Sequence, residues 1–307
     1  MLPPRFSLQL TWLLKQYLLL SFFVVGAACD APQNLRDLYD AIRAKRQCSN
    51  ELATGFYSKS SGSNTFSYCG DRLQSSGIIY LQGRNGALAN MDVDCDGVGG
   101  VAEDGRCRYE LSPDTQNVTS FRDAVVGYGK GLKDLNPYVH PYVVFGNDKG
   151  TRHRAGWHPF DPTEKGMKPL SVMAVVCSGY QVVYGIWGDT NGDDGAKPMI
   201  GEASLALATA CGGKGMNGDS GIDEDSILFA GFTGDEAVPG ANGANWTATD
   251  FDSFEKSIEG LGTQLVGRIQ ADKTDKAGAS GSGRIEPEWV HVAGAAAFVL
   301  VLGITLL

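Results

Sequence analysis

Two acidic residues stand out because each lies where an apolar segment meets a polar one. Asp189 follows the apolar run 181–187, and Glu202 opens the Ala/Leu-rich segment 202–211. If the first segment forms a strand and the second a helix, the strand end and the helix start can face one cleft. Such a pair suits hydrolysis of a glycosidic bond, in which one carboxylic acid protonates the leaving oxygen and one carboxylate activates water or attacks. The alternative is purely structural: Asp189 makes a turn and Glu202 favours a helix N-terminus.

Residues next to this pair are candidates for binding a substrate. The aromatic ring of Trp187 could stack on a sugar ring. The polar, glycine-rich loop that follows supplies Asn191, Asp193 and Asp194. Later loops are also acidic and could attract a cationic substrate, or they are ordinary solvated turns. The acids of these later loops are Asp219, Asp223, Glu224 and Asp225.

One segment fits the formula of a calcium-binding EF-hand loop. Its carboxylates are Asp92, Asp94, Asp96 and Glu103. However, Gly99 replaces the usual apolar residue, the flanking residues do not have a helical pattern, and the cysteine within the loop is a candidate for a disulfide. We therefore favour a structural acidic turn without metal.

Other motifs carry less weight. Residues 218–221 resemble the nucleophile motif of serine proteases, but 208–211 lacks the histidine that such a protease needs. His153 and His158 are five residues apart, and we interpret them as surface polar residues rather than metal ligands. The sequence thus predicts neither a metal nor a cofactor.

Eight ordered motifs carry a resemblance to a known family. They are YCGD (68–71), NMDVDCDG (90–97), DLNP (134–137), HPYVVFGN (140–147), PLSVMAVVC (169–177), YGIWGDTNGDD (184–194), GEASLALATAC (201–211) and MNGD (216–219). Together they resemble the fungal chitosanases of glycoside hydrolase family 75, over about residues 48–270.

The resemblance implies endo-hydrolysis of β-1,4-linked glucosamine polymers with inversion. The essential Asp of the family's Trp-Gly-Asp motif matches Asp189, and the essential Glu of its Gly-Glu-Ala-Ser motif matches Glu202. The implied partner is chitosan, which is a polycation near and below neutral pH. The alternative from another class is a noncatalytic glycan-binding or wall-structural protein on the same scaffold, and the intact carboxylate pair argues against it.

Composition agrees with a folded, β-rich domain. Of 307 residues, 43% are hydrophobic and 20% are charged, which excludes global disorder. The 41 glycines show no collagen period and so indicate many turns. The formal net charge of −9 argues against nucleic acid as a partner, because nucleic-acid binding relies on basic patches.

Hydrophobic periodicity predicts a few helices among many short strands. Helices are expected over 34–46, 202–211 and 252–266, the last beginning with a capping box formed by Asp252 and Glu255. Strands are expected over 78–81, 142–145, 171–177, 181–187 and 227–232, with a hairpin turn at 178–180. We therefore predict one β-rich α+β catalytic domain. Its segment around the two acids is similar to that of double-psi β-barrel glycan-cleaving enzymes.

Cysteines and sequons indicate the secretory pathway. Six of the seven cysteines remain if cleavage follows Cys29, an even number suited to disulfides. Six cysteines allow 15 pairings, of which we favour first the local pair Cys95–Cys107 and second Cys177–Cys211. Asn117 and Asn245 each begin a glycosylation sequon.

Both chain ends have the pattern of processing signals. Residues 1–29 read as a signal peptide, with basic residues, an apolar run and a small-residue exit. Residues 30–270 form the predicted catalytic domain, and 271–283 a linker rich in small residues with a lipid attachment site at Gly278 or Ser280. Residues 284–307 end in an apolar tail with no basic residue after it, as in a glycosylphosphatidylinositol (GPI) signal that is removed. A membrane contact is expected only through that lipid.

The C-terminal pattern makes a testable prediction. Phosphatidylinositol-specific phospholipase should release the mature protein from cell membranes, because the enzyme cuts the lipid and not the chain. Immunoblotting of the soluble fraction checks this. An intact mature protein that presents an epitope at Leu307 to the cytosol would contradict it.

Overall fold

The computed structural model describes residues 29–100, 102–108, 110–111, 113–147, 158–192 and 197–270. They lie in the first of two compact units, Met1–Ala271. Residues 1–28 of the predicted signal peptide and the whole predicted GPI signal lie outside the described residues. Within the described part of the chain, no helix is both long and apolar enough to cross a bilayer.

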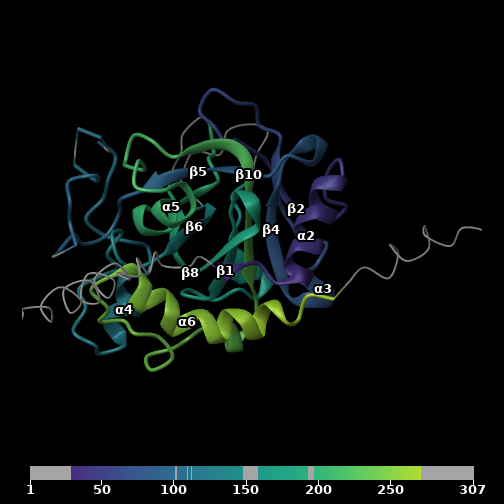
Figure 1. The fold of residues 1–307 in the computed structure, drawn as a ribbon. Helices are drawn as coiled ribbons and strands as arrows, with labels where there is room; N and C mark the ends of the chain where they lie inside the picture. Colours follow the sequence, from purple (N-terminus) through teal and green to yellow (C-terminus); the bar gives the residue numbers. More distant parts are fainter. Residues whose placement is uncertain are drawn as a thin grey trace, which may run out of the picture. The chain divides into compact units, whose positions relative to one another are not determined.

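The chain alternates short strands with a few helices (Figure 1). The strands are β1 (Cys29–Asp30), β2 (Glu51–Phe56), β3 (Phe66–Cys69), β4 (Ile78–Gln82), β5 (Ala89–Asp94), β6 (Tyr142–Asn147), β7 (Val172–Val176), β8 (Gln181–Asn191), β9 (Glu202–Ser204) and β10 (Ile222–Phe232). The helices are α2 (Gln33–Ala44), α3 (Leu73–Ser76), α4 (Arg122–Gly127), α5 (Leu205–Gly212) and α6 (Phe251–Val266). The predicted β-rich α+β class is confirmed.

The strands form one mixed sheet in the order β1-β8-β6-β9-β5-β10-β4-β3-β2. Strand β7 pairs with both β10 and β8, so the pairing also runs in a closed cycle through β8, β6, β9, β5, β10 and β7. Two pairs in this cycle, β5/β9 and β6/β8, are parallel. Because the cycle is closed, its strands hold one another on both edges, which makes them a rigid base for side chains.

Alternate strand residues fill two hydrophobic clusters. Helices α2 and α6 contribute to one cluster and α5 to the other. In Figure 1, α6 runs along one side of the sheet. It packs closely because Gly262 faces the ring of Tyr184, where even a Cβ would come within 2.3 Å of the ring. Large buried side chains therefore cover the sheet on both faces.

Most element predictions are confirmed, but two local predictions are wrong. The hairpin between β7 and β8 and the helix near 34–46 are present. Glu202 does not open a helix: it begins strand β9, and the helix starts after Ser204, whose side chain accepts a bond from the backbone N–H of Leu207. The predicted capping box is also wrong, because Asp250 is the N-cap of α6.

Three disulfides cross-link the domain. The predicted pairs Cys95–Cys107 and Cys177–Cys211 are confirmed, and the third is Cys48–Cys69. The local spacing predicted the first of these pairs, whereas the third joins the segment after α2 to β3.

A buried histidine links two loops to α6. His140 is 3% exposed, and its ring lies edge-on against Phe254. Its Nδ1 accepts a bond from the backbone N–H of Asn136 (2.8 Å), which leaves the proton on Nε2, 3.2 Å from the carbonyl of Trp246. Burial lowers the pKa of His140 to about 4.

This histidine should make the fold sensitive to acid. The unfolded chain takes up a proton on His140 near its ordinary pKa of about 6.5, whereas the folded chain does so only near 4. Stability from this site is therefore present above pH 6.5 and is lost as pH falls towards 4. Urea unfolding of the wild type and of His140→Gln, measured between pH 7 and 4, should show a shrinking difference in unfolding free energy. A constant difference over this range would contradict the assignment.

Candidate active site

Two adjoining hollows form a cleft over the ends of β5, β8 and β9. One has a volume of about 750 Å³ and the other about 510 Å³. Five residues line both: Asp96, Gln116, Asp189, Thr190 and Gly192. Asp189 thus lies where the two hollows meet, and a chain-like ligand could pass it on both sides.

A one-residue bulge in β8 sets the direction of the Asp189 side chain. Trp187 pairs with Val143 of β6, but the next pair along is Asp189 with Val144. Gly188 is therefore the extra residue. Because side chains alternate between faces, the bulge brings Asp189 to the face of β6 that carries Val144.

Strand β9 brings Glu202 to the same place from the other edge of β6. Glu202 pairs with Val144 on one side and with Asp92 of β5 on the other. Asp189 and Glu202 therefore flank Val144 across β6, and all three line the larger hollow. At a strand spacing of about 4.8 Å, their backbones lie roughly 10 Å apart.

The carboxyl group of Asp189 is buried, and one of its oxygens is saturated with hydrogen bonds. Oδ1 accepts bonds from the Ser120 backbone N–H (3.0 Å), the Ser120 hydroxyl (2.5 Å) and the Thr190 backbone N–H (2.7 Å). The side chain is 4% exposed, and no described protein atom bonds to Oδ2. Burial raises the pKa of Asp189, while the bonds from Ser120 and Thr190 lower it. Oδ2 is the oxygen left to exchange a proton.

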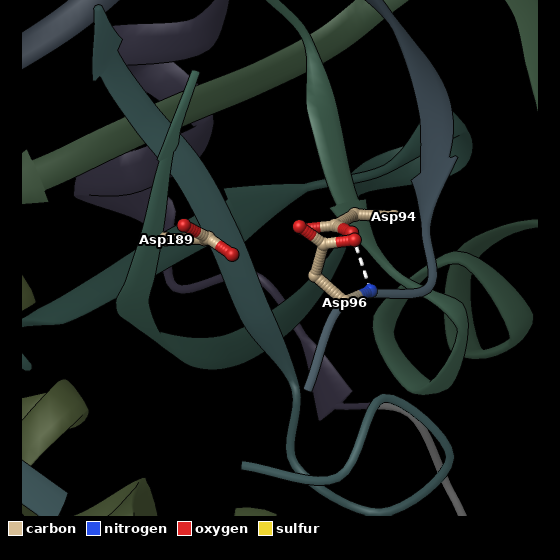
Figure 2. Close-up of side chains that lie close together, drawn as sticks. All are labelled: Asp94, Asp96 and Asp189. Carbon is tan, nitrogen blue, oxygen red and sulfur yellow. Dashed lines mark hydrogen bonds between the residues drawn. The ribbon is translucent and has the colours of Figure 1, made fainter. Parts of the chain in front are cut away.

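Two further carboxyl groups lie beside Asp189, at the end of β5. One oxygen each of Asp94, Asp96 and Asp189 lies within 4.8 Å of the others (Figure 2). Burial and the nearby charges of Glu202, Asp189 and Asp96 raise the pKa of Asp94 well above its usual range. Burial likewise raises the pKa of Asp96 to about 7. The site is thus a dense cluster of carboxyl groups in which a proton is easily retained.

This arrangement differs from an EF-hand loop. Asp92 and Asp94 belong to strand β5, and Glu103 is exposed. Burial and the charge of Asp223 raise the pKa of Asp92 to about 6, although a bond from Asn90 lowers it. Of the acids in the motif, the end of β5 presents Asp94 and Asp96 to Asp189, where the three could in principle hold a cation.

The candidate substrate-binding residues differ in how far the structure exposes them to the cleft. Trp187 is only 1% exposed; its ring packs edge-on against Phe121, and its Nε1 donates to the carbonyl of Asp189. Trp187 also lines the smaller hollow, but its burial leaves almost none of the ring open for stacking on a sugar. Asn191 lines the larger hollow but is mostly buried, whereas Asp193 and Asp194 lie outside the described residues.

Asp223, Glu224 and Asp225 belong to strand β10 and not to a loop as predicted, and only some of the later acids reach the cleft. Asp219 and Asp223 line the larger hollow, whereas Asp225 forms an ion pair with Lys59. Asn117 and Asn245 are exposed, so both sequon asparagines are accessible, and their glycosylation stays a prediction.

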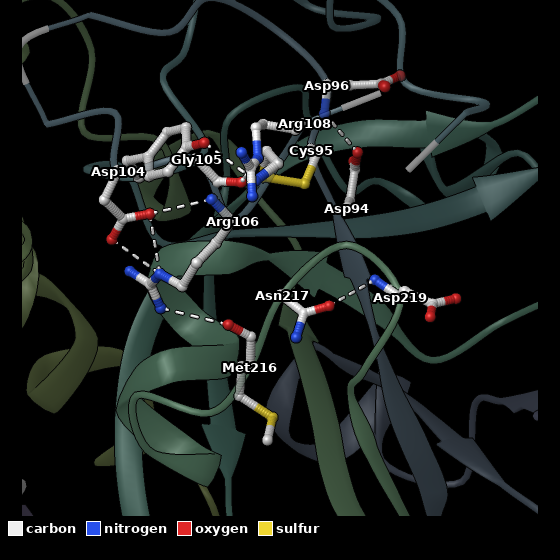
Figure 3. Close-up of a disulfide and its surroundings, with 12 residues drawn as sticks. Asp94, Cys95, Asp96, Asp104, Gly105, Arg106, Arg108, Met216, Asn217 and Asp219 are labelled. Atoms are coloured by element: carbon white, nitrogen blue, oxygen red, sulfur yellow. Dashed lines mark hydrogen bonds and ion pairs between the residues drawn. A yellow bond between two sulfur atoms is a disulfide. The ribbon is translucent and has the colours of Figure 1, made fainter. Parts of the chain in front are cut away.

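One wall of the cleft is fixed by the Cys95–Cys107 disulfide and its neighbour Arg106 (Figure 3). The Arg106 guanidinium pairs with Asp104 and donates to the Met216 carbonyl. The Arg106 carbonyl accepts from the backbone N–H of Gly218, which lines the cleft. These bonds connect the loop after β5 to the loop after α5, so the two loops keep a fixed position relative to each other.

Ser120 is a site residue that sequence reasoning missed. It lies far from Asp189 along the chain and carries no motif of its own; its only signal is that it follows the 117–119 sequon. The preceding residue, Thr119, is buried and bonded to Asp134 through both its N–H and its hydroxyl. Asp134 thus holds the loop that brings Ser120 to Asp189.

Comparison with known proteins shows the family to which the chain belongs. Residues 91–268 match the family described as fungal chitosanase of glycosyl hydrolase group 75. The chain is 40% identical to "Endo-chitosanase B" of Aspergillus oryzae and 41% identical to "Endo-chitosanase" of Aspergillus fumigatus. Each alignment covers 84% of this chain and 99% of the relative. The chain therefore belongs to the fungal chitosanase family of glycoside hydrolases, as its motifs predicted.

The Ser120 hydroxyl gives a testable prediction about Asp189. Ser120→Ala removes one donor that favours the ionised carboxylate, so the pKa of Asp189 should rise further. The acid limb of the kcat/KM profile on chitosan should move up by roughly one pH unit. Ser120→Thr keeps the hydroxyl and serves as the control. An unchanged acid limb in Ser120→Ala would show that the hydroxyl does not tune Asp189.

Proposed function

We propose that this protein hydrolyses β-1,4 linkages between glucosamine residues within chitosan chains. The observation that carries the proposal is the placement of Asp189 and Glu202 on either side of Val144, facing one cleft, in a member of the fungal chitosanase family. Its relatives are named endo-chitosanases. Hollows on both sides of Asp189 support endo action, because a polymer can extend past the reacting bond in both directions.

In the proposed mechanism Asp189 is the general base and Glu202 the general acid. Three donors hold Oδ1 of Asp189 and favour its anion, which leaves Oδ2 to take a proton from water. Glu202 then protonates the leaving glycosidic oxygen. Backbones two strands apart leave room for a water between the sugar and the base, which supports inversion at the anomeric carbon; inverting enzymes have carboxyl groups roughly 6.5–9.5 Å apart.

The acidic cleft suits a polycationic substrate. Asp92, Asp94, Asp96 and Asp223 line the larger hollow together with the proposed catalytic pair. Carboxylates concentrated in a cleft raise the local concentration of a cationic chain and speed its association.

The remaining predictions are part of the same proposal. The closed cycle of six strands, with its two parallel pairs, supports a barrel of the double-psi type. Three disulfides support passage through an oxidising compartment, as expected of a secreted protein. We place the mature chain, residues 30–280 or close to it, at the cell surface on a GPI lipid attached at Gly278 or Ser280.

A reducing-sugar assay on soluble chitosan separates this proposal from the noncatalytic alternative. Asp189→Asn and Glu202→Gln keep the shape of each side chain but remove proton transfer, which is typically worth ~10²–10⁴ in rate. Both variants should fold, bind chitosan and release reducing ends at least about a hundredfold more slowly. Circular dichroism and chitosan co-sedimentation check folding and binding.

The matched control is Asp123→Asn, which removes one exposed carboxylate on α4 that lines neither hollow. It should retain wild-type activity. Near-normal activity in both cleft variants would contradict the assignment. Binding of chitosan by the wild type without any cleavage would favour the noncatalytic scaffold.

A further inference from the structure

The carboxyl groups of Asp94, Asp96 and Asp189 share one structural feature. Each is anchored through its Oδ1 by a backbone N–H: Asp94 by Asp96 (2.7 Å), Asp96 by Gln116 (2.6 Å), and Asp189 by Ser120 and Thr190. The anchors fix the orientation of all three groups. The Oδ2 atoms lie outside these bonds, and that of Asp189 is buried with no partner among the described residues.

The fixed cluster lies where both hollows meet. Asp96 and Asp189 line both hollows, and Asp94 lines the larger one. Figure 2 shows the carboxyl groups of Asp94 and Asp96 side by side at the end of β5, with Asp189 opposite them. Any ligand atom bound here lies next to the oxygen that we assign to proton transfer.

The spacing suits a primary ammonium group. Such a group has three N–H donors in tetrahedral directions, and charge-assisted bonds of about 2.8 Å place its acceptors about 4.6 Å apart. One oxygen each of Asp94 and Asp96 lies within 4.8 Å of the other, so these two groups can accept two of the donors, while the oxygen of Asp189 within the same distance is left for water. In glucosamine the amino group is on carbon 2, which is bonded to the anomeric carbon. The base activates the water that attacks the anomeric carbon, so the base and the site for the ammonium group must be neighbours.

We propose that Asp94 and Asp96 form a specificity site for the 2-ammonium group of the glucosamine whose anomeric carbon is attacked, and that Oδ2 of Asp189 holds the attacking water. This inference rests on the proposed function. Asp94 and Asp96 bind the substrate's cation and take no part in proton transfer. An N-acetyl group has one N–H donor and no charge, and it is bulkier, so the same site should disfavour it.

The electrostatics of the cluster favour a cationic ligand. Asp94 is 6% exposed and has Asp96, Asp189 and Glu202 as acidic neighbours. Burial and the repulsion between carboxylates held this close raise the pKa of Asp94. A bound ammonium group offsets this repulsion and stabilises the ionised carboxylates, which favours its binding.

The test compares two substrates on the full-length enzyme at pH 6. One is a fully deacetylated glucosamine hexamer, and the other is a hexamer that is N-acetylated only at the residue whose anomeric carbon is attacked. Wild type should favour the first in kcat/KM. Asp96→Asn and Asp94→Asn should each lower kcat/KM on the deacetylated hexamer about tenfold or more, and the preference should shrink by a similar factor.

Asp123→Asn makes the same charge change outside the cleft and should leave the preference unchanged. A preference that is unchanged in Asp94→Asn and Asp96→Asn, with cleavage of chitosan intact, overturns the inference but leaves the proposed function standing. Activity lost in a chelator and restored by calcium would also overturn it, because the cluster would then be a metal site. A wild type that cleaves neither hexamer nor chitosan would instead contradict the proposed function.

Discussion

The active-site geometry depends on one extra residue in β8. Without a bulge at Gly188, strict alternation would pair Asp189 with Phe145, whose side chain lies in the buried cluster on the opposite face from Val144. Glycine is required at this position because a Cβ would lie 2.5 Å from the Cβ of Tyr142. The glycine of the Trp-Gly-Asp motif therefore acts through the backbone: it lets the strand bulge, so that the Asp189 carboxylate lies on the face of Val144, which lines the cleft, and not on the face of Phe145.

The second constraint is electrostatic. The strands around β9 bring several carboxyl groups together in one cleft. Burial and mutual repulsion raise the pKa values of these groups. Asp189 differs from its neighbours because three donors converge on a single oxygen. Unequal environments within one cluster let one carboxyl group hold a proton while another loses it, as acid–base catalysis requires.

The sequence predicted the chemistry of the site better than its geometry. Asp189 and Glu202 became candidates because each lies at the boundary of an apolar segment, and the resemblance to the chitosanase family assigned them a role. The strand at Glu202 was missed because the following Ala/Leu-rich residues have strong helix propensity, and pairing with β5 and β6 overrides it for three residues. Ser120 joins Asp189 through tertiary contacts that leave no local pattern. Asp94 and Asp96 fitted a loop formula, and only their place at the end of β5 assigns them to this cleft.

The stereochemistry of the first product tests the central claim most directly. If Asp189 and Glu202 act across β6 with a water between base and sugar, hydrolysis of a β-linkage must invert the anomeric carbon. Proton NMR of the wild-type reaction on a glucosamine oligomer, recorded before mutarotation, should show the α-anomer appearing first. Initial formation of the β-anomer would mean retention, which requires carboxyl groups only about 5 Å apart, and would contradict the proposed arrangement.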